Sequence, residues 1–261
     1  MTVVSSFIWG CNDNEANNGP SGTEPPPATI SFTVVNQYPH DTMSFTQGLT
    51  FHNGQLYEST GSGNPERVNN GSWAGVVDLQ TGKQLRKIQL DTQYFGEGIT
   101  ILNDKLYFLT WTTNIGFIYD VKTFKKTGEF KYPGEGWGLT DDGKNLIMSN
   151  GTNNLVIYEP DSMKMISQLS VTDHNGPVGN LNELEYINGY IFANQWMTSY
   201  ILKIDPASGK VVGKMDCDAL YRDIREEASG NYLNGIAYND STQKVYITGK
   251  LWPSLFEIRL Q

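Results

Sequence analysis

A short phrase that recurs five times constrains the fold of this chain more than any other feature of its sequence. The phrase consists of a polar or aromatic residue, then usually glycine, an aliphatic residue and usually threonine. The copies recur every 40 to 52 residues and begin at Gln47, Glu97, Trp137, Asn182 and Asn234. Such a period is typical of repeat architectures, in which each unit buries its apolar faces against its neighbours.

The residues that follow each copy alternate between turn and strand patterns. After the copy at Glu97, a turn at 103–104 precedes β-rich runs at 105–110, 116–120 and 127–131. Four short antiparallel strands in each repeat are typical of one blade of a β-propeller. The sequence therefore predicts an all-β fold, a five-bladed β-propeller.

The fifth repeat contains only three predicted strands before the chain ends, at 235–238, 244–248 and 255–260. A run with good alternation, 29–36, precedes the first repeat and is predicted to be the missing outer strand. This N-terminal strand would complete the last blade and close the ring, which protects the sheet edges. The segment 218–229 departs from the strand pattern and predicts a short inserted helix.

Residues 1–28 differ in composition from the predicted propeller domain, 29–261. Residues 12–28 are rich in Asn, Gly, Pro and Glu, so we expect a disordered tether. The preceding residues 8–11 (IWGC) resemble the lipobox of bacterial lipoproteins, although the apolar segment is short and no Lys or Arg precedes it. We expect an exported protein, either periplasmic or membrane-anchored through a lipid on Cys11; the alternative is an ordinary disordered tail.

Charge and histidine content exclude several classes of function. The net charge is −9 and no basic run is present, which argues against nucleic-acid binding. The three histidines show no zinc-hydrolase spacing. We expect a monomer without a metal or cofactor.

The repeat also predicts where functional side chains gather. The innermost strand of each blade lines the propeller axis, so the first residue of each phrase faces the mouth of the central channel. A second set follows the second strand of each repeat and comprises Gly61, Trp111, Gly151, Trp196 and Lys250. A structural repeat would favour one residue type at each point, whereas these positions differ, which indicates a site.

The predicted pocket combines aromatic walls with one carboxylate, several amides and one ammonium. Aromatic walls exclude water and strengthen electrostatic contacts, and a partly desolvated carboxylate can transfer a proton near neutral pH. A tryptophan in an all-β protein more often packs in the hydrophobic core than lines a binding pocket. A non-catalytic peptide- or glycan-binding propeller of the cell envelope, or a structural scaffold there, therefore remains an alternative.

Nine phrases, in this order and at blade spacing, carry a family resemblance. They are SFTQGL (44–49), ESTG (58–61), FGEGIT (95–100), LTW (109–111), EGWGLT (135–140), LNELEY (181–186), ANQW (193–196), LNGIA (233–237) and TGKLWP (248–253). From about Tyr38 onward, the chain resembles the plant-type glutaminyl-peptide cyclotransferases, or glutaminyl cyclases, which also occur in bacteria. The resemblance implies a five-bladed propeller that needs no catalytic metal. It also implies conversion of the N-terminal glutamine of peptides or proteins to pyroglutamate, with release of ammonia.

The resemblance also implies roles for individual residues. Glu97 matches the catalytic glutamate and would act as the proton shuttle, with Asn182 and Lys250 as further catalytic residues. The substrate-binding residues would be Phe45, Gln47, Phe95, Trp111, Trp137 and Trp196. The roles of Gln47, Asn182 and Lys250 in orienting the amide or stabilising an oxyanion are not divided at this point.

Overall fold

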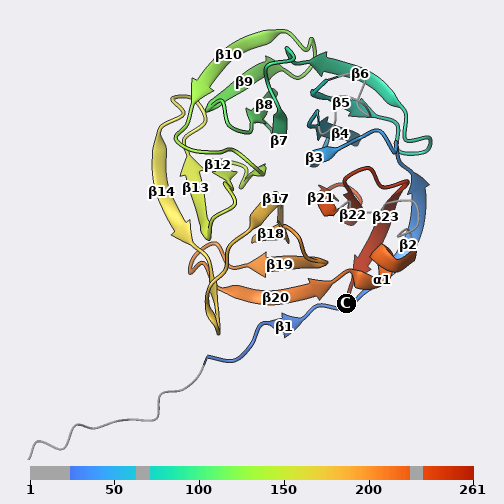
Figure 1. The fold of residues 1–261 in the computed structure, drawn as a ribbon, viewed down its shortest axis with the longest axis vertical. Helices are drawn as coiled ribbons and strands as arrows, with labels where there is room; N and C mark the ends of the chain where they lie inside the picture. The colour runs from blue at the N-terminus through green and yellow to red at the C-terminus, as the bar shows by residue number, and fades with distance from the viewer. Residues whose placement is uncertain (1–23, 63–70, 224–231) are drawn as a thin grey trace, which may run out of the picture.

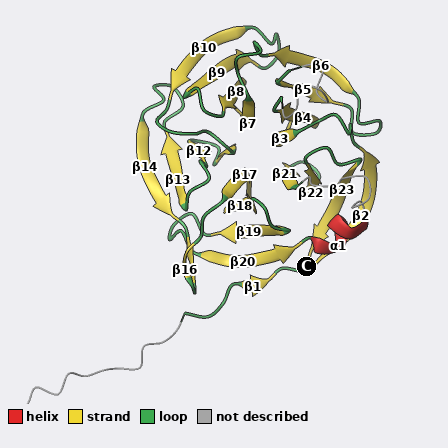
Figure 2. Cartoon of the chain, in the orientation of Figure 1, coloured by secondary structure: helices red, strands yellow, loops and turns green. Residues whose placement is uncertain are grey.

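The computed structural model describes residues 24–62, 71–223 and 232–261. These residues form six β-sheets, of which the five with four or five strands are arranged as a ring (Figure 1). Strands make up almost all of the regular structure, and one short helix lies at the periphery (Figure 2). The predicted all-β fold with five blades is confirmed.

Each blade runs from an inner strand near the axis to an outer strand at the rim. Blade 1 consists of β3 (Thr46–His52), β4 (Gln55–Thr60), β5 (Trp73–Val77) and β6 (Gln84–Gln89). Blade 2 consists of β7 (Gly96–Leu102), β8 (Lys105–Thr110), β9 (Ile115–Asp120) and β10 (Lys126–Lys131). Blade 3 consists of β11 (Leu139–Asp141), β12 (Leu146–Met148), β13 (Asn154–Tyr158) and β14 (Met165–Ser170).

Blade 4 consists of β17 (Leu181–Ile187), β18 (Tyr190–Gln195), β19 (Tyr200–Ile204), β20 (Val211–Asp216) and the two-residue β1 (Ala28–Thr29). Blade 5 consists of β21 (Leu233–Asn239), β22 (Lys244–Gly249), β23 (Ser254–Leu260) and β2 (Phe32–Pro39). A small hairpin of β15 (Thr172–Asp173) and β16 (Gly176–Pro177) lies between blades 3 and 4 in the sequence.

Two-residue turns join the first two strands of three blades. Both residues of each turn have positive φ angles, and the pairs are Asn53-Gly54, Asn103-Asp104 and Asn188-Gly189. A turn of this kind matches the right-handed twist of the flanking strands, and Asn, Asp and Gly tolerate the left-handed conformation best. These local turns keep each inner hairpin tight at the end of the strand opposite the repeat phrase.

The N-terminal strand lies later in the sequence than predicted. The outer strand of blade 5 is β2, which pairs antiparallel with β23 from Phe32 to Pro39, whereas 29–36 was expected. Ala28 and Thr29 instead pair in parallel with β20, so regular structure already begins at Ala28. Gly213 explains the difference, because its missing side chain leaves room for Ile30, whose Cδ1 would lie 2.6 Å from an added Cβ.

The hydrophobic core is divided among the blade interfaces. Within the described residues, five buried clusters each join side chains of two adjacent blades. Between blades 1 and 2, for example, Tyr57 and Val76 share a cluster with Ile99 and Phe108. Each blade is therefore stabilised by burial against its neighbours, as a repeat architecture requires.

Several predictions fall partly or wholly outside the described residues. Cys11 and the lipobox-like segment lie there, so lipidation stays a prediction. The predicted helix is observed as α1 (Asp218–Asp223), and the rest of its predicted span, 224–229, is outside. In the described part of the chain, no helix is long and apolar enough to cross a membrane. No cluster of three or more metal-ligating side chains occurs there either.

Candidate active site

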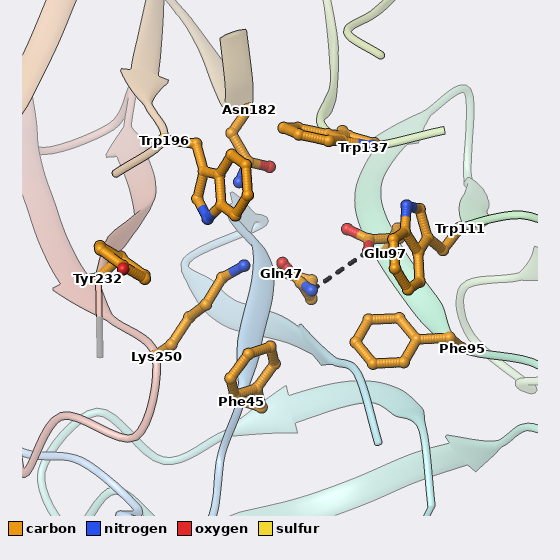
Figure 3. A pocket seen from close by; sticks show the side chains of 10 residues that line it. All are labelled: Phe45, Gln47, Phe95, Glu97, Trp111, Trp137, Asn182, Trp196, Tyr232 and Lys250. Atoms are coloured by element: carbon orange, nitrogen blue, oxygen red, sulfur yellow. Dashed lines mark hydrogen bonds between the residues drawn. The ribbon is translucent and has the colours of Figure 1, made fainter. Parts of the chain in front are cut away.

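A pocket of about 340 Å³ opens among the inner strands and receives side chains from all five blades (Figure 3). This volume is near the lower end of the range for small-molecule sites, roughly 300 to 1,000 Å³. Its lining residues are Phe45, Gln47, Phe95, Glu97, Trp111, Trp137, Asn182, Trp196, Tyr232 and Lys250.

Register shifts in the inner strands coincide with the repeat phrase. In blades 1 and 2 the ladder is interrupted between Thr46 and Gly48 and between Gly96 and Ile99, the intervals that hold Gln47 and Glu97. Blades 4 and 5 have equivalent shifts at 181–184 and 233–236. A bulge bends the strand and redirects a side chain, which explains why the phrase delivers functional groups rather than ladder residues.

Two glycines of the predicted second set make room for the aromatic walls. A Cβ added to Gly61 would lie 2.2 Å from the ring of Phe95, and one added to Gly151 would lie 2.7 Å from the ring of Trp137. The turn after the second strand therefore contributes Trp111, Trp196 or Lys250 in three blades. In the other two blades the turn holds Gly61 or Gly151, whose missing side chain leaves space for the ring of Phe95 or Trp137.

The aromatic wall consists of two arcs. The first arc runs through Phe45, Phe95 and Trp111, with neighbouring ring centroids 6.3 and 5.6 Å apart. The second runs through Trp137, Trp196 and Tyr232, with centroids 5.4 and 6.3 Å apart. All four contacts are edge-on, an arrangement that aromatic rings favour over face-to-face stacking. The wall is therefore built of rings that hold one another in place.

Glu97 is the buried carboxylate of the pocket and is only 5% exposed. The amide of Gln47 donates a hydrogen bond to its Oε1 at 3.2 Å (Figure 3). Asn234 does not line the pocket; its amide donates to the Oε1 of Gln47 at 3.3 Å and to the carbonyl of Thr46 at 3.0 Å. This chain of amides orients Gln47 and, through it, the carboxylate.

Lys250 and Asn182 complete the polar part of the pocket. The Nζ of Lys250 lies 4.8 Å from the ring centroid of Phe45, close enough for a cation–π contact. The Oδ1 of Asn182 is buried and has no hydrogen-bond partner among the described residues. An unpaired buried acceptor is costly, so the pocket holds an acceptor that a ligand N–H can satisfy.

Burial shifts the proton affinities of the two charged groups in opposite directions. Desolvation raises the pKa of Glu97 well above its ordinary value, and the charge of Lys250 opposes this shift. Desolvation likewise lowers the pKa of Lys250, and the charge of Glu97 opposes it. Both groups are thus brought closer to the pH range in which they can exchange protons with a substrate.

The structure brings all nine predicted site residues to this one pocket, while their chemical roles stay predictions. Tyr232 is the lining residue that the sequence analysis missed. A signal for it exists, because Phe45 and Phe95 lie two residues before Gln47 and Glu97, and Tyr232 lies two before Asn234. The position two residues ahead of the phrase is therefore a third source of pocket side chains.

The chain matches known proteins over almost its whole length. A model of the glutamine cyclotransferase family matches residues 3–260. The glutaminyl-peptide cyclotransferase of Arabidopsis thaliana is 40% identical over 232 residues, which cover 87% of this chain and 71% of that protein. The crystal structure of the Myxococcus xanthus glutaminyl cyclase has a TM-score of 0.83 at 36% identity, covering 90% of this chain and 98% of that one.

Proposed function

Because this chain belongs to the glutamine cyclotransferase family, we propose that it converts the N-terminal glutamine of peptides or proteins to pyroglutamate. The observation that carries the proposal is the burial of one carboxylate, Glu97, and one ammonium, Lys250, in a single small aromatic pocket. Burying charged groups is unfavourable, so their presence together favours catalysis over simple binding.

The reaction is intramolecular. The α-nitrogen of the substrate attacks its own side-chain carboxamide carbon, a C–N bond forms, and the bond to the amide nitrogen breaks with release of ammonia. The attacking amine loses a proton and the leaving –NH2 gains one. One carboxylate can perform both transfers, and Glu97 is the carboxylate that lines this pocket.

The polar contacts support a division of roles among the other residues. Gln47 already donates to Glu97, so we assign it to orienting the carboxylate. Lys250, which has only donors, would stabilise the oxygen that becomes negative as the carbonyl is attacked. The unpaired Oδ1 of Asn182 would accept an N–H of the substrate.

The aromatic arcs would hold glutamine in the curled conformation that the attack requires. Holding reacting groups in line is a large source of rate enhancement, because it removes rotational freedom before the barrier is reached. The two arcs face each other across Glu97 and Lys250 (Figure 3). An extended side chain would leave the carboxamide away from the α-nitrogen, so the shape of the wall matters as much as its polarity.

The direct test is incubation of the purified protein with a glutamine-initiated dipeptide. We expect release of ammonia and a mass loss of about 17 Da, because the lactam differs from its precursor by one ammonia. An asparagine-initiated dipeptide serves as the control, since its shorter side chain cannot close the five-membered ring. Binding of the glutamine peptide without either product would instead indicate the non-catalytic binding propeller, which the comparisons do not favour.

Export and attachment to a membrane through Cys11 remain a separate proposal that rests on the lipobox-like residues 8–11 alone. The test is incorporation of a labelled fatty acid during expression in a bacterium. Incorporation that is absent from the Cys11→Ser variant is expected, and equal labelling of both proteins would contradict lipidation at this residue.

A further inference from the structure

One carboxylate outside the pocket lining joins its two aromatic arcs. Glu135 lies two residues before Trp137, between β10 and β11. Its Oε2 accepts a hydrogen bond from the indole Nε1 of Trp111 at 2.7 Å and another from that of Trp137 at 2.8 Å. The ten described residues that line the pocket do not include Glu135.

The contact spans two blades. Trp111 follows β8 of blade 2 and ends the first arc, whereas Trp137 precedes β11 of blade 3 and begins the second. The main chain beside Glu135 is anchored as well, because the amide of Gly136 donates to the carbonyl of Trp111 at 3.1 Å. On the opposite side of the pocket the arcs are joined through Lys250, whose amide donates to the carbonyl of Tyr232 at 2.9 Å and whose Nζ faces Phe45.

Glu135 also departs from the pattern of its repeat position. The corresponding residues in blades 1, 2 and 5 are Phe45, Phe95 and Tyr232, each of which contributes a ring to the pocket. In blade 3 that place holds a carboxylate that contacts two rings instead of supplying one. A local departure from a repeat is expected where function, not packing, selects the residue.

We propose that Glu135 is a positioning residue of the cyclisation site, which fixes the indoles of Trp111 and Trp137 so that they hold the substrate glutamine in its reactive conformation. This inference rests on the function proposed above. A hydrogen bond to an ionised acceptor is roughly twice as strong as a neutral one. One oxygen that holds both indoles fixes each ring relative to the other as well as to the backbone.

The same contact determines which face of the indoles the substrate meets. With both N–H groups directed to Glu135, the rings offer the pocket carbon surface and no donor. The carboxamide of the substrate is then left to Glu97, Asn182 and Lys250 for its polar contacts. The charge of Glu135 also contributes to raising the pKa of Glu97, after the larger effect of burial.

Two substitutions separate the effect of Glu135 as a hydrogen-bond acceptor for the indoles from the effect of its negative charge. Glu135→Ala removes the acceptor and the charge, whereas Glu135→Gln removes the charge and keeps an oxygen that can accept from the indoles. The matched control is Glu129→Ala on β10, an exposed glutamate that pairs with Lys126 at 2.7 Å. Steady-state kinetics on the glutamine dipeptide, their pH dependence and near-ultraviolet circular dichroism of the tryptophans are measured for each protein.

We expect Glu135→Ala to lower kcat/KM on the order of 10- to 100-fold, since small misplacements of positioning groups cost that much. Glu135→Gln should recover most of this loss. In both variants the pH midpoint that reports Glu97 should move to lower pH, because a neighbouring negative charge is gone. A kcat/KM for Glu135→Ala within about twofold of the Glu129→Ala control would overturn the proposal, as would a Gln variant no better than the Ala variant.

A double-mutant cycle tests whether Glu135 acts through the indoles. In a Trp111→Phe, Trp137→Phe background, which lacks both N–H donors, Glu135→Ala should cost little more, and an undiminished further loss would contradict the proposal. If the wild-type protein releases no ammonia, the proposed function fails. The positioning of the two indoles by Glu135 would still be tested. Glu135→Ala must change the near-ultraviolet spectrum of the tryptophans, and the Glu129→Ala control must not.

Discussion

The Nε2 of His40 lies 3.0 Å from the Oε1 of Glu58, and both side chains are 2% exposed. The other ring nitrogen of His40 donates to the carbonyl of Trp252 at 2.6 Å, and the hydroxyl of Thr46 donates to Glu58 at 2.7 Å. Both ring nitrogens face an oxygen acceptor, an arrangement that a charged imidazolium satisfies by donating from each. His40 therefore joins β4 of blade 1, through Glu58, to the segment after Lys250 in blade 5, through the carbonyl of Trp252.

This pair predicts that stability falls as the pH rises. Burial lowers the pKa of His40, but the charge and hydrogen bond of Glu58, the Trp252 carbonyl and the charge of Asp41 raise it, so the pKa is raised overall. A raised folded-state pKa contributes stability that is full below the unfolded pKa, about 6.5, and is lost as the pH rises through the folded one.

The measurement is urea denaturation across this pH range for the wild type and His40→Gln. We expect the variant to lose roughly 3 to 5 kcal/mol below the folded-state pKa, because a buried partner is left unpaired. The difference between the two proteins should narrow at higher pH. A constant difference across the range would show that His40 is not charged in the folded protein.

Glu97→Gln should separate activity from stability. We expect turnover to fall by roughly 10²- to 10⁴-fold, the usual contribution of general acid–base catalysis. Because burial raises the pKa of Glu97 in the fold, its stabilising contribution is lost as the pH rises through that pKa. The variant should therefore be at least as stable as the wild type in thermal unfolding at pH 7. A large loss of stability, or activity close to wild type, contradicts the assignment.

Lys250→Met should change the pH profile as well as the rate. Loss of the only ammonium that lines the pocket among the described residues should lower kcat on the order of 10²-fold, as when an oxyanion donor is removed. The charge of Lys250 lowers the pKa of Glu97, so the acid limb of the kcat/KM profile should move to higher pH. Burial lowers the pKa of Lys250, so we expect an alkaline limb in the wild-type profile that is missing from this variant. An unchanged profile would remove Lys250 from the site chemistry.

Gly61→Ala should weaken substrate binding by moving Phe95. The new methyl group would lie 2.2 Å from the ring, so Phe95 and the contact it makes with Trp111 must shift. We expect KM to rise roughly tenfold, given the cost of small misplacements in a binding wall. Gly128→Ala on β10 is the control, because its Cβ would meet the nearest atom, of Ile118, at 3.6 Å, an ordinary contact. Equal KM values for the two variants would show that Phe95 adapts without consequence.

The residues that line the pocket could be predicted from the sequence because one offset repeats. Gln47, Glu97, Trp137 and Asn182 share a position in the phrase, and the ring places equivalent positions at the same end of the axis. The predicted closing strand, 29–36, begins three residues before the observed one, Phe32–Pro39. The alternation of apolar and polar residues is compatible with a strand at either position. The space over Gly213 that holds Ile30 arises only when blade 4 is assembled.

The sequence by itself determined the number of blades, their strand order and most of the side chains that line the pocket, because these follow from periodicity along the chain. Only the tertiary structure decided that Glu135 holds two indoles from different blades, that Asn234 supports Gln47, and that burial shifts the pKa values of Glu97 and Lys250 toward each other. These properties depend on distances through space and on the exclusion of water. Both are set by how five blades pack around one axis.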